Sequence, residues 1–148
     1  MLRATSVIGF ALIALLVACA RPTVSPALTQ GQALTWLDSK SGSPEMDVSG
    51  AWESTSPFMA GGWGNASLVQ MGSKVSGTLG LYTVEGRVAG KQIFLMILSN
   101  GQVYYTAILE PTKDGGIAGM AVSKILADDP EAKLAERAPI SLVRIPSK

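Results

Sequence analysis

The chain contains no histidine, and its 148 residues include a single cysteine. These absences exclude serine–histidine and cysteine–histidine catalytic pairs, histidine-ligated metals and any disulfide within the chain. Charge is also scarce, because only 16% of the residues are charged and 12 basic side chains against 11 acidic ones leave a net charge of +1. Such a balance gives no electrostatic basis for binding nucleic acid. We therefore predict no metal, no cofactor and no nucleic-acid partner.

Apolar residues are abundant instead, at 47% of the chain. This fraction is too high for a disordered protein and suits one small folded domain. Glycine is frequent, with 16 residues, and proline is moderate, with 8. That profile favours many short strands joined by turns over long helices.

The first residues have the features of a secretory signal. Arg3 precedes an apolar run from Val7 to Ala18, which is shorter than the roughly 20 residues needed to span a bilayer. The run ends in Leu16-Val17-Ala18-Cys19, which resembles the lipobox of bacterial lipoproteins. The resemblance implies that residues 1–18 are removed and that Cys19 carries the acyl chains. An ordinary signal peptide with a chance cysteine and an uncleaved helical anchor are the alternatives.

The residue after this cysteine is Ala20 and not aspartate. In bacterial lipoproteins, aspartate at that place is the usual signal for retention in the inner membrane. The resemblance therefore implies a protein of the cell envelope, lipid-anchored in the outer membrane and facing the periplasm. The expected divisions are a signal peptide (1–18), a lipidated N-terminus with a tether (19–46) and a β-domain (47–148).

One part of the expected tether has an apolar side. The stretch from Thr29 to Ser39 contains no proline and carries Leu34, Trp36 and Leu37. We expect a short helix here, near 29–39, that docks on the domain. A free tether that exposes Trp36 to a partner is the alternative.

From Asp47 onward the apolar residues recur with a period of two, interrupted by glycine and asparagine clusters about every 8–12 residues. No segment of crossover-helix length separates the runs. The pattern predicts an all-β fold, an antiparallel meander of eight strands that closes into an up-and-down barrel, with a β-sandwich as the alternative. Asn100-Gly101 predicts a type I′ hairpin turn. The expected strands are 47–54, 65–71, 74–81, 82–89, 91–99, 102–110, 116–124 and 139–146.

The first and last strands carry a second resemblance. Gly50-Ala51-Trp52 is similar to the Gly-x-Trp signature of the lipocalin and calycin barrels, and Arg144 takes the place of their arginine that packs over the tryptophan. The resemblance implies that Gly50, Trp52 and Arg144 meet where the barrel closes. A guanidinium stacked on an indole gains about 0.5–2 kcal/mol.

Two further segments could carry chemistry or contacts. Asp128-Asp129-Pro130-Glu131 has the composition of a metal or acid cluster, but it also matches a helix start with Asp129 as N-cap, and we expect a short helix over 130–137.

The glycine-rich loop from Ser56 to Gly64 holds aromatic and sulfur side chains suited to a ligand or partner contact, with a lid over the core as the alternative. Its candidate contact residues are Phe58, Met59 and Trp63.

The segment Ile93–Leu98 is apolar at every position. Successive side chains of a strand point to opposite faces, so half of them must point out of a barrel and need a cover. We expect the segment around Leu34–Leu37 to supply it, then a second copy or protein partner, then the membrane.

The sequence favours a lipid-anchored, non-enzymatic interaction or accessory module. The alternative is a lipocalin-like carrier of a small apolar ligand, which the strand glycines Gly77, Gly86 and Gly119 would favour by leaving room inside the barrel.

Overall fold

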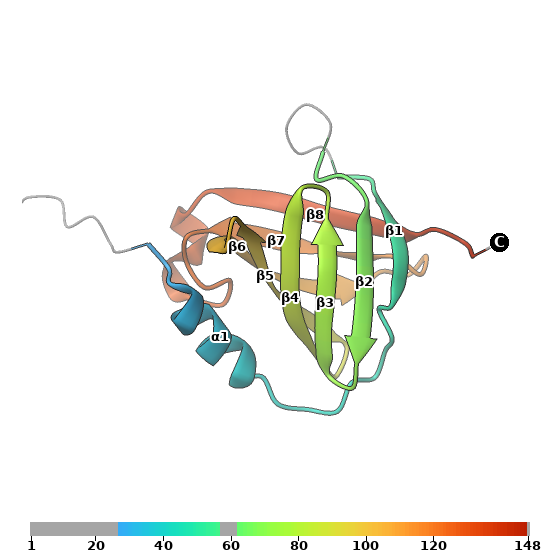
Figure 1. The fold of residues 1–148 in the computed structure, drawn as a ribbon, viewed down its shortest axis with the longest axis horizontal. Coiled ribbons are helices and arrows are strands. Elements are labelled where there is room, and N and C mark those ends of the chain that lie inside the picture. Colours follow the sequence, from blue (N-terminus) through green and yellow to red (C-terminus); the bar gives the residue numbers. More distant parts are fainter. Residues whose placement is uncertain (1–26, 57–61, 148) are drawn as a thin grey trace, which may run out of the picture.

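The computed structural model of the protein describes residues 27–56 and 62–147. Cys19, Phe58 and Met59 lie outside the described residues. Eight antiparallel strands follow one another in chain order and form a closed barrel, with one α-helix on its outside (Figure 1). The elements are α1 (Gln30–Asp38), β1 (Gly50–Ser54), β2 (Ala66–Met71), β3 (Lys74–Leu79), β4 (Tyr82–Ala89), β5 (Gln92–Ser99), β6 (Gln102–Pro111), β7 (Ile117–Ser123), the 3₁₀ helix η1 (Pro130–Leu134) and β8 (Arg137–Arg144).

The pairing of β1 with β8 closes the barrel and confirms the predicted meander, not the sandwich. Closure satisfies the backbone groups that two open edges would leave unpaired. The hairpin between β5 and β6 turns at Asn100 and Gly101, whose φ angles of 50° and 73° are both positive. The turn therefore has the backbone signs that the Asn-Gly pair predicts.

The two largest differences from the predicted element boundaries lie at the start of β1 and at the end of η1. β1 begins at Gly50 and not at Asp47, because the Asp47 carboxylate accepts a hydrogen bond from the Ser49 N–H at 2.8 Å and draws the chain into a turn. The predicted helix over 130–137 is shorter, since Arg137 already pairs with Val122 in the sheet. Asp129 is the N-cap of η1, as expected, and accepts from the Glu131 N–H at 2.8 Å.

Helix α1 begins with a capping box between Thr29 and Gln32. The Thr29 hydroxyl accepts from the Gln32 N–H, and the Gln32 side chain accepts from the Thr29 N–H, so two N–H groups without helical partners are satisfied. The helix lies along one side of the barrel, and the chain after it passes below the barrel to reach β1 (Figure 1). This passage is fixed to the sheet where Pro44 bridges Gly90.

The barrel interior is a continuous apolar core contributed by all eight strands. Val48, which is fully buried, closes the end of the barrel at which β1 begins. Trp63, which is 3% exposed, contributes to the core at the other end. The core therefore includes side chains from the segments before and after β1 as well as from the strands.

The predicted contact between Trp52 and Arg144 is present at the closure. The two residues are directly opposite each other, and the Arg144 guanidinium carbon lies 4.3 Å from the centroid of the Trp52 ring. The guanidinium also donates to the Ser49 carbonyl at 2.5 Å and to the Asp47 carbonyl at 2.8 Å. A Cβ at Gly50 would lie 3.0 Å from this guanidinium, so the glycine leaves the arginine its place. The arginine thus ties the entering chain to the last strand.

Replacing Trp52 by alanine is expected to lower the free energy of unfolding by about 3–5 kcal/mol, because a fully buried indole is lost. In a double-mutant cycle with Arg144→Ala, we expect a coupling of about 0.5–2 kcal/mol. Chemical denaturation of the four variants measures both values. Additive effects would contradict an energetic role for the stacked pair.

Candidate binding surfaces on the barrel wall

Strand β5 has two apolar faces, and the structure buries both. Ile93, Leu95 and Ile97 point into the barrel core. Phe94, Met96 and Leu98 point outward and join a second apolar cluster that contains Ala33, Trp36 and Leu37 of α1. The helix therefore covers the outer wall from within the same chain, which confirms the first of the three expected covers.

One of the three residues expected to form this cover does not. Leu34 is 38% exposed, whereas Trp36 and Leu37 are each 5% exposed. Ala33 is fully buried and takes a place on the covering side. The helical period places residues 33, 36 and 37 on one face and leaves Leu34 at its edge.

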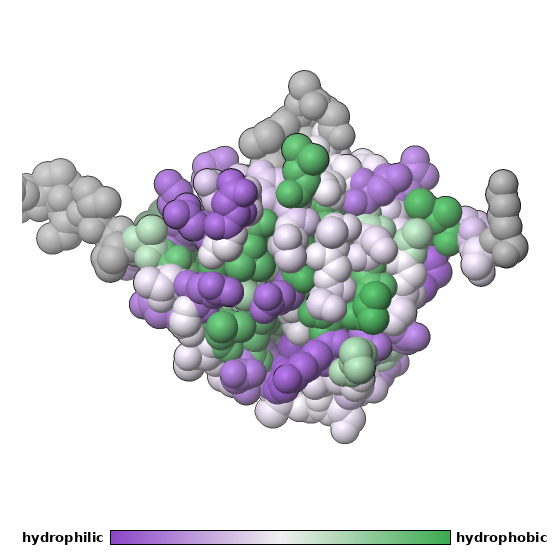
Figure 2. All heavy atoms as spheres, viewed as in Figure 1, coloured by the Kyte–Doolittle hydropathy of each residue, from purple (hydrophilic) through white to green (hydrophobic). Residues whose placement is uncertain are grey.

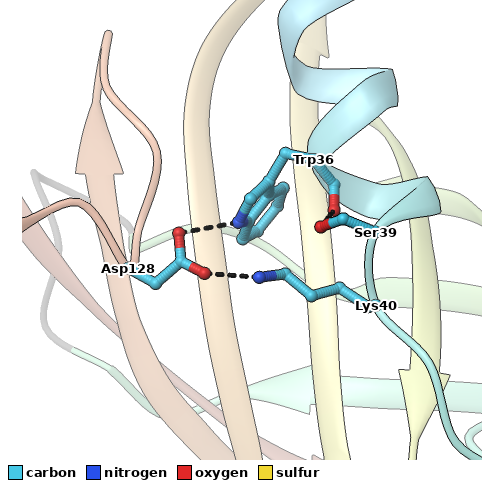
Figure 3. A network of polar contacts seen from close by, with 4 residues as sticks. All are labelled: Trp36, Ser39, Lys40 and Asp128. Carbon is cyan, nitrogen blue, oxygen red and sulfur yellow. Dashed lines mark hydrogen bonds and ion pairs between the residues drawn. The ribbon is translucent and has the colours of Figure 1, made fainter.

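A polar network holds α1 to the barrel (Figure 3). The Trp36 indole N–H donates to the Asp128 carboxylate at 2.7 Å, and the Lys40 ammonium forms an ion pair with the other oxygen of the same carboxylate. The Trp36 ring also meets Phe94 edge to face, with the ring centroids 5.8 Å apart. The Lys40 nitrogen lies 5.1 Å from the centroid of each of these rings. We call Trp36, Lys40 and Asp128 the helix latch.

The contacts of the helix latch lower the pKa of the Asp128 carboxyl. Partial burial raises the pKa of this carboxyl, but the hydrogen bonds from Lys40 and Trp36 and the positive charge of Lys40 outweigh it and hold the pKa below its usual value. A lowered folded-state pKa means that the ionised carboxylate stabilises the fold. This contribution is complete above the usual aspartate pKa and is lost as the pH falls through the lowered value.

Replacing Trp36 by alanine is expected to uncover the outward side chains of β5, with a loss of about 3 kcal/mol in the free energy of unfolding. The variant should bind a hydrophobic dye that the parent chain does not bind. Leu34→Ala is the matched control, because Leu34 lies on the same helix and is partly exposed. Equal dye binding by the two variants would mean that α1 does not protect this wall.

Replacing Asp128 by asparagine is expected to cost about 1 kcal/mol at neutral pH, a small value because the side chain is 41% exposed. The difference from the parent chain should stay constant from pH 7 down to about pH 4 and shrink below it, where the parent carboxylate takes up a proton. Urea denaturation over this pH range measures it. If the stability difference between the parent chain and Asp128→Asn grew towards acid pH, the pKa of Asp128 would be raised in the folded state and the prediction would be wrong.

The far end of the barrel from Val48 is rich in aromatic side chains. Trp63 meets Tyr82 and Tyr105 edge to face, with ring centroids 5.7 and 5.2 Å away, and its indole N–H donates to the Pro139 carbonyl at 2.7 Å. Trp63 is thus buried as part of the core. Its predicted contact with a ligand or partner stays a prediction, as do those of Phe58 and Met59.

The strand glycines do not leave space in the barrel, contrary to the expectation from the sequence. A Cβ at Gly77 would lie 1.9 Å from the Ser67 carbonyl oxygen, and one at Gly119 would lie 2.0 Å from the Ile108 carbonyl oxygen. At Gly86 it would meet the Phe94 carbonyl oxygen at 2.4 Å. The neighbouring strands occupy these positions with their own backbone, so the glycines serve close strand approach.

An open groove of about 680 Å³ runs on the outside of the barrel, between α1 and the outer face of β2, β3 and β4. Its sheet side carries two exposed apolar side chains, Val69 at 54% and Met71 at 78%. Its helix side carries Leu34 and Asp38. Figure 2 shows hydrophobic and hydrophilic residues side by side on this face. We call it the α1 groove.

The pairing register of β2, β3 and β4 determines which charged side chains of the α1 groove are neighbours. Lys74 is paired with Met71 on one side and with Arg87 on the other, so two cations are direct cross-strand neighbours. Glu85 lies in the next row, opposite Ser76. Arg87 donates to the Lys40 carbonyl at 2.9 Å, and the only ion pair among the described residues is that of Lys40 with Asp128. Lys74 is therefore left without an acidic partner in this part of the chain.

Asp128 and Asp129 have structural roles, as latch and as helix cap. Over residues 27–56 and 62–147, no group of three or more acidic or cysteine side chains is arranged to hold a metal ion. No helix in those two ranges has the length and apolar character needed to cross a membrane.

Comparisons with known proteins find no matching family, no similar curated protein and no similar solved structure.

Sequence reasoning missed the helix latch and the α1 groove. Lys40 and Asp128 are 88 positions apart, and neither belongs to a motif that would connect them. Gln70 was also missed: its side chain accepts from the Val48 N–H at 2.9 Å and donates to the Met46 carbonyl at 3.0 Å, which fixes the chain below the barrel. The exposed Val69 and Met71 could have been noted, because they break the alternation of β2 with apolar residues on its polar face.

Proposed function

We propose that this protein is a lipid-anchored, non-enzymatic module of the bacterial cell envelope that acts by binding a protein partner on the outside of its barrel. Acyl chains on Cys19 would hold it at a membrane, with the outer membrane as the expected site. The Leu16-Val17-Ala18-Cys19 ending and Cys19 as the chain's one cysteine support the anchor. Two or more acyl chains give stable anchoring, whereas one gives only reversible binding.

The observation that carries the binding role is the contrast between the interior and the outside of the barrel. Inside, buried apolar side chains from all eight strands form one continuous core, and neighbouring backbone leaves no room for a Cβ at Gly77, Gly86 or Gly119. Outside, the α1 groove exposes Leu34, Val69 and Met71 to solvent. Exposed apolar side chains gathered beside a groove with a polar rim are typical of interaction surfaces.

Carriage of a small apolar ligand inside the barrel is the alternative function. It loses the support expected from Gly77, Gly86 and Gly119, since these residues make no room. A partner or a second copy on the Ile93–Leu98 face also remains a prediction. It would require α1 to leave, because α1 covers the outward half of that face.

The experiment is a native mass spectrum of the full chain purified from membranes in detergent. We expect the mass of a chain that starts at Cys19 and carries lipid, with no small molecule bound. Cys19→Ser should lose the lipid mass and move to the soluble periplasmic fraction. A parent chain without lipid that fractionates like the serine variant would refute the anchor, and a copurifying apolar molecule would favour the carrier.

A further inference from the structure

The two sides of the α1 groove are complementary in chemistry but do not meet within one chain. The helix side presents an apolar and an acidic residue, Leu34 and Asp38, which are four positions apart and share one edge of α1. The sheet side presents Val69, Met71 and the basic Lys74. Asp38 and Lys74 line the same groove, but among the described residues they form no ion pair with each other. Each side of the groove thus offers an apolar side chain and a charge opposite in sign to that of the other side.

Both charges lie where a partner would stabilise them. Asp38 is exposed in the last turn of α1, which holds no basic residue, and a negative charge there opposes the helix dipole. Lys74 is exposed directly opposite another cation, Arg87, and like charges in that position are unfavourable. An acid brought to Lys74 and a base brought to Asp38 would relieve both.

We propose that the α1 groove binds a second copy of this chain, in a twofold arrangement that places the Leu34–Asp38 edge of each α1 against Val69, Met71 and Lys74 of the other copy. A twofold axis makes each contact occur twice, so two exposed apolar contacts and two ion pairs form together. This inference rests on the proposed function and names its partner.

The charges favour a second copy over a lipid surface. The groove is lined by two acids, Asp38 and Glu85, and two bases, Lys74 and Arg87, so it has no net charge with which to attract an anionic headgroup. A net charge of +1 for the chain also causes little repulsion between copies. The exposed apolar side chains, 38% for Leu34 and 78% for Met71, supply the contact that the charges then orient.

Disulfide cross-linking in membranes tests this arrangement on the full chain. Two copies with different epitope tags are co-expressed, one with Asp38→Cys and the other with Lys74→Cys, and the membranes are oxidised. We expect a disulfide-linked dimer that carries both tags, because the two Cβ atoms would come within bridging distance, about 3.5–4.5 Å. The matched control replaces Asp38→Cys by Leu134→Cys, at an exposed leucine of η1.

The cross-linking experiment distinguishes a failure of the proposed dimer from a failure of the proposed lipid anchor. A tagged parent chain without added cysteines shows whether Cys19 is a free thiol. If this chain forms a disulfide-linked dimer, Cys19 is not acylated and the proposed anchor is wrong. The dimer yield of the Asp38→Cys pair can still be compared with that of the Leu134→Cys control. Met71→Glu in both copies should abolish the specific dimer by placing a charge in the apolar contact. A dimer yield no higher than that of the Leu134→Cys pair would overturn the proposal.

Charge exchange provides a second measurement, by sedimentation of the detergent-solubilised full chain. Asp38→Lys and Lys74→Asp should each weaken the dimer by about tenfold, and a chain with both changes should regain it. Rescue by the double variant requires that the two residues meet, and both are exposed, so neither change disturbs the core. A monomeric parent chain, or two single changes without rescue, would overturn the pairing.

Discussion

The alternation of side chains along β5 is the constraint on which the arrangement of this protein depends. A strand can point only every second residue into a barrel, yet β5 is apolar on both faces. Leaving Phe94, Met96 and Leu98 in water would forgo about 1.5–3 kcal/mol for each side chain. Helix α1 removes this cost by packing across them. The segment that forms α1 is therefore part of the folded domain and not merely a connection to it.

The position of α1 has consequences on both sides of the helix. The face of α1 that covers β5 places the Trp36 ring against Phe94. In this position the indole N–H donates to Asp128, and the ring lies beside the Lys40 ammonium. Its edge stands away from β2 and β3 and leaves the α1 groove open. One packing contact thus creates the latch and the exposed surface together.

Much of the fold could be predicted from local patterns. The period of two and the spacing of the turns gave the eight strands to within a few residues, and Asn100-Gly101 marked its hairpin correctly. Closure was also predicted, from the pattern of eight consecutive strands, and the stacking of Arg144 on Trp52 was predicted from a resemblance to other barrels. The predicted contacts of Phe58, Met59 and Trp63 with a ligand or partner stay predictions. Trp63 is buried in the core, and the α1 groove was not foreseen.

The sequence by itself determined the strand order, the turns, the apolar excess of β5 and the helix that covers it. These features depend on residue spacing along a few neighbouring positions, which periodicity reports directly. Only the tertiary structure decided that Asp128 joins Lys40, that Gly77 and Gly119 lie against backbone, and that Leu34 faces a groove. These outcomes depend on which distant segments come into contact. The local pattern does not determine these contacts, because the same alternation of apolar and polar residues is compatible with many arrangements of one strand or helix beside another.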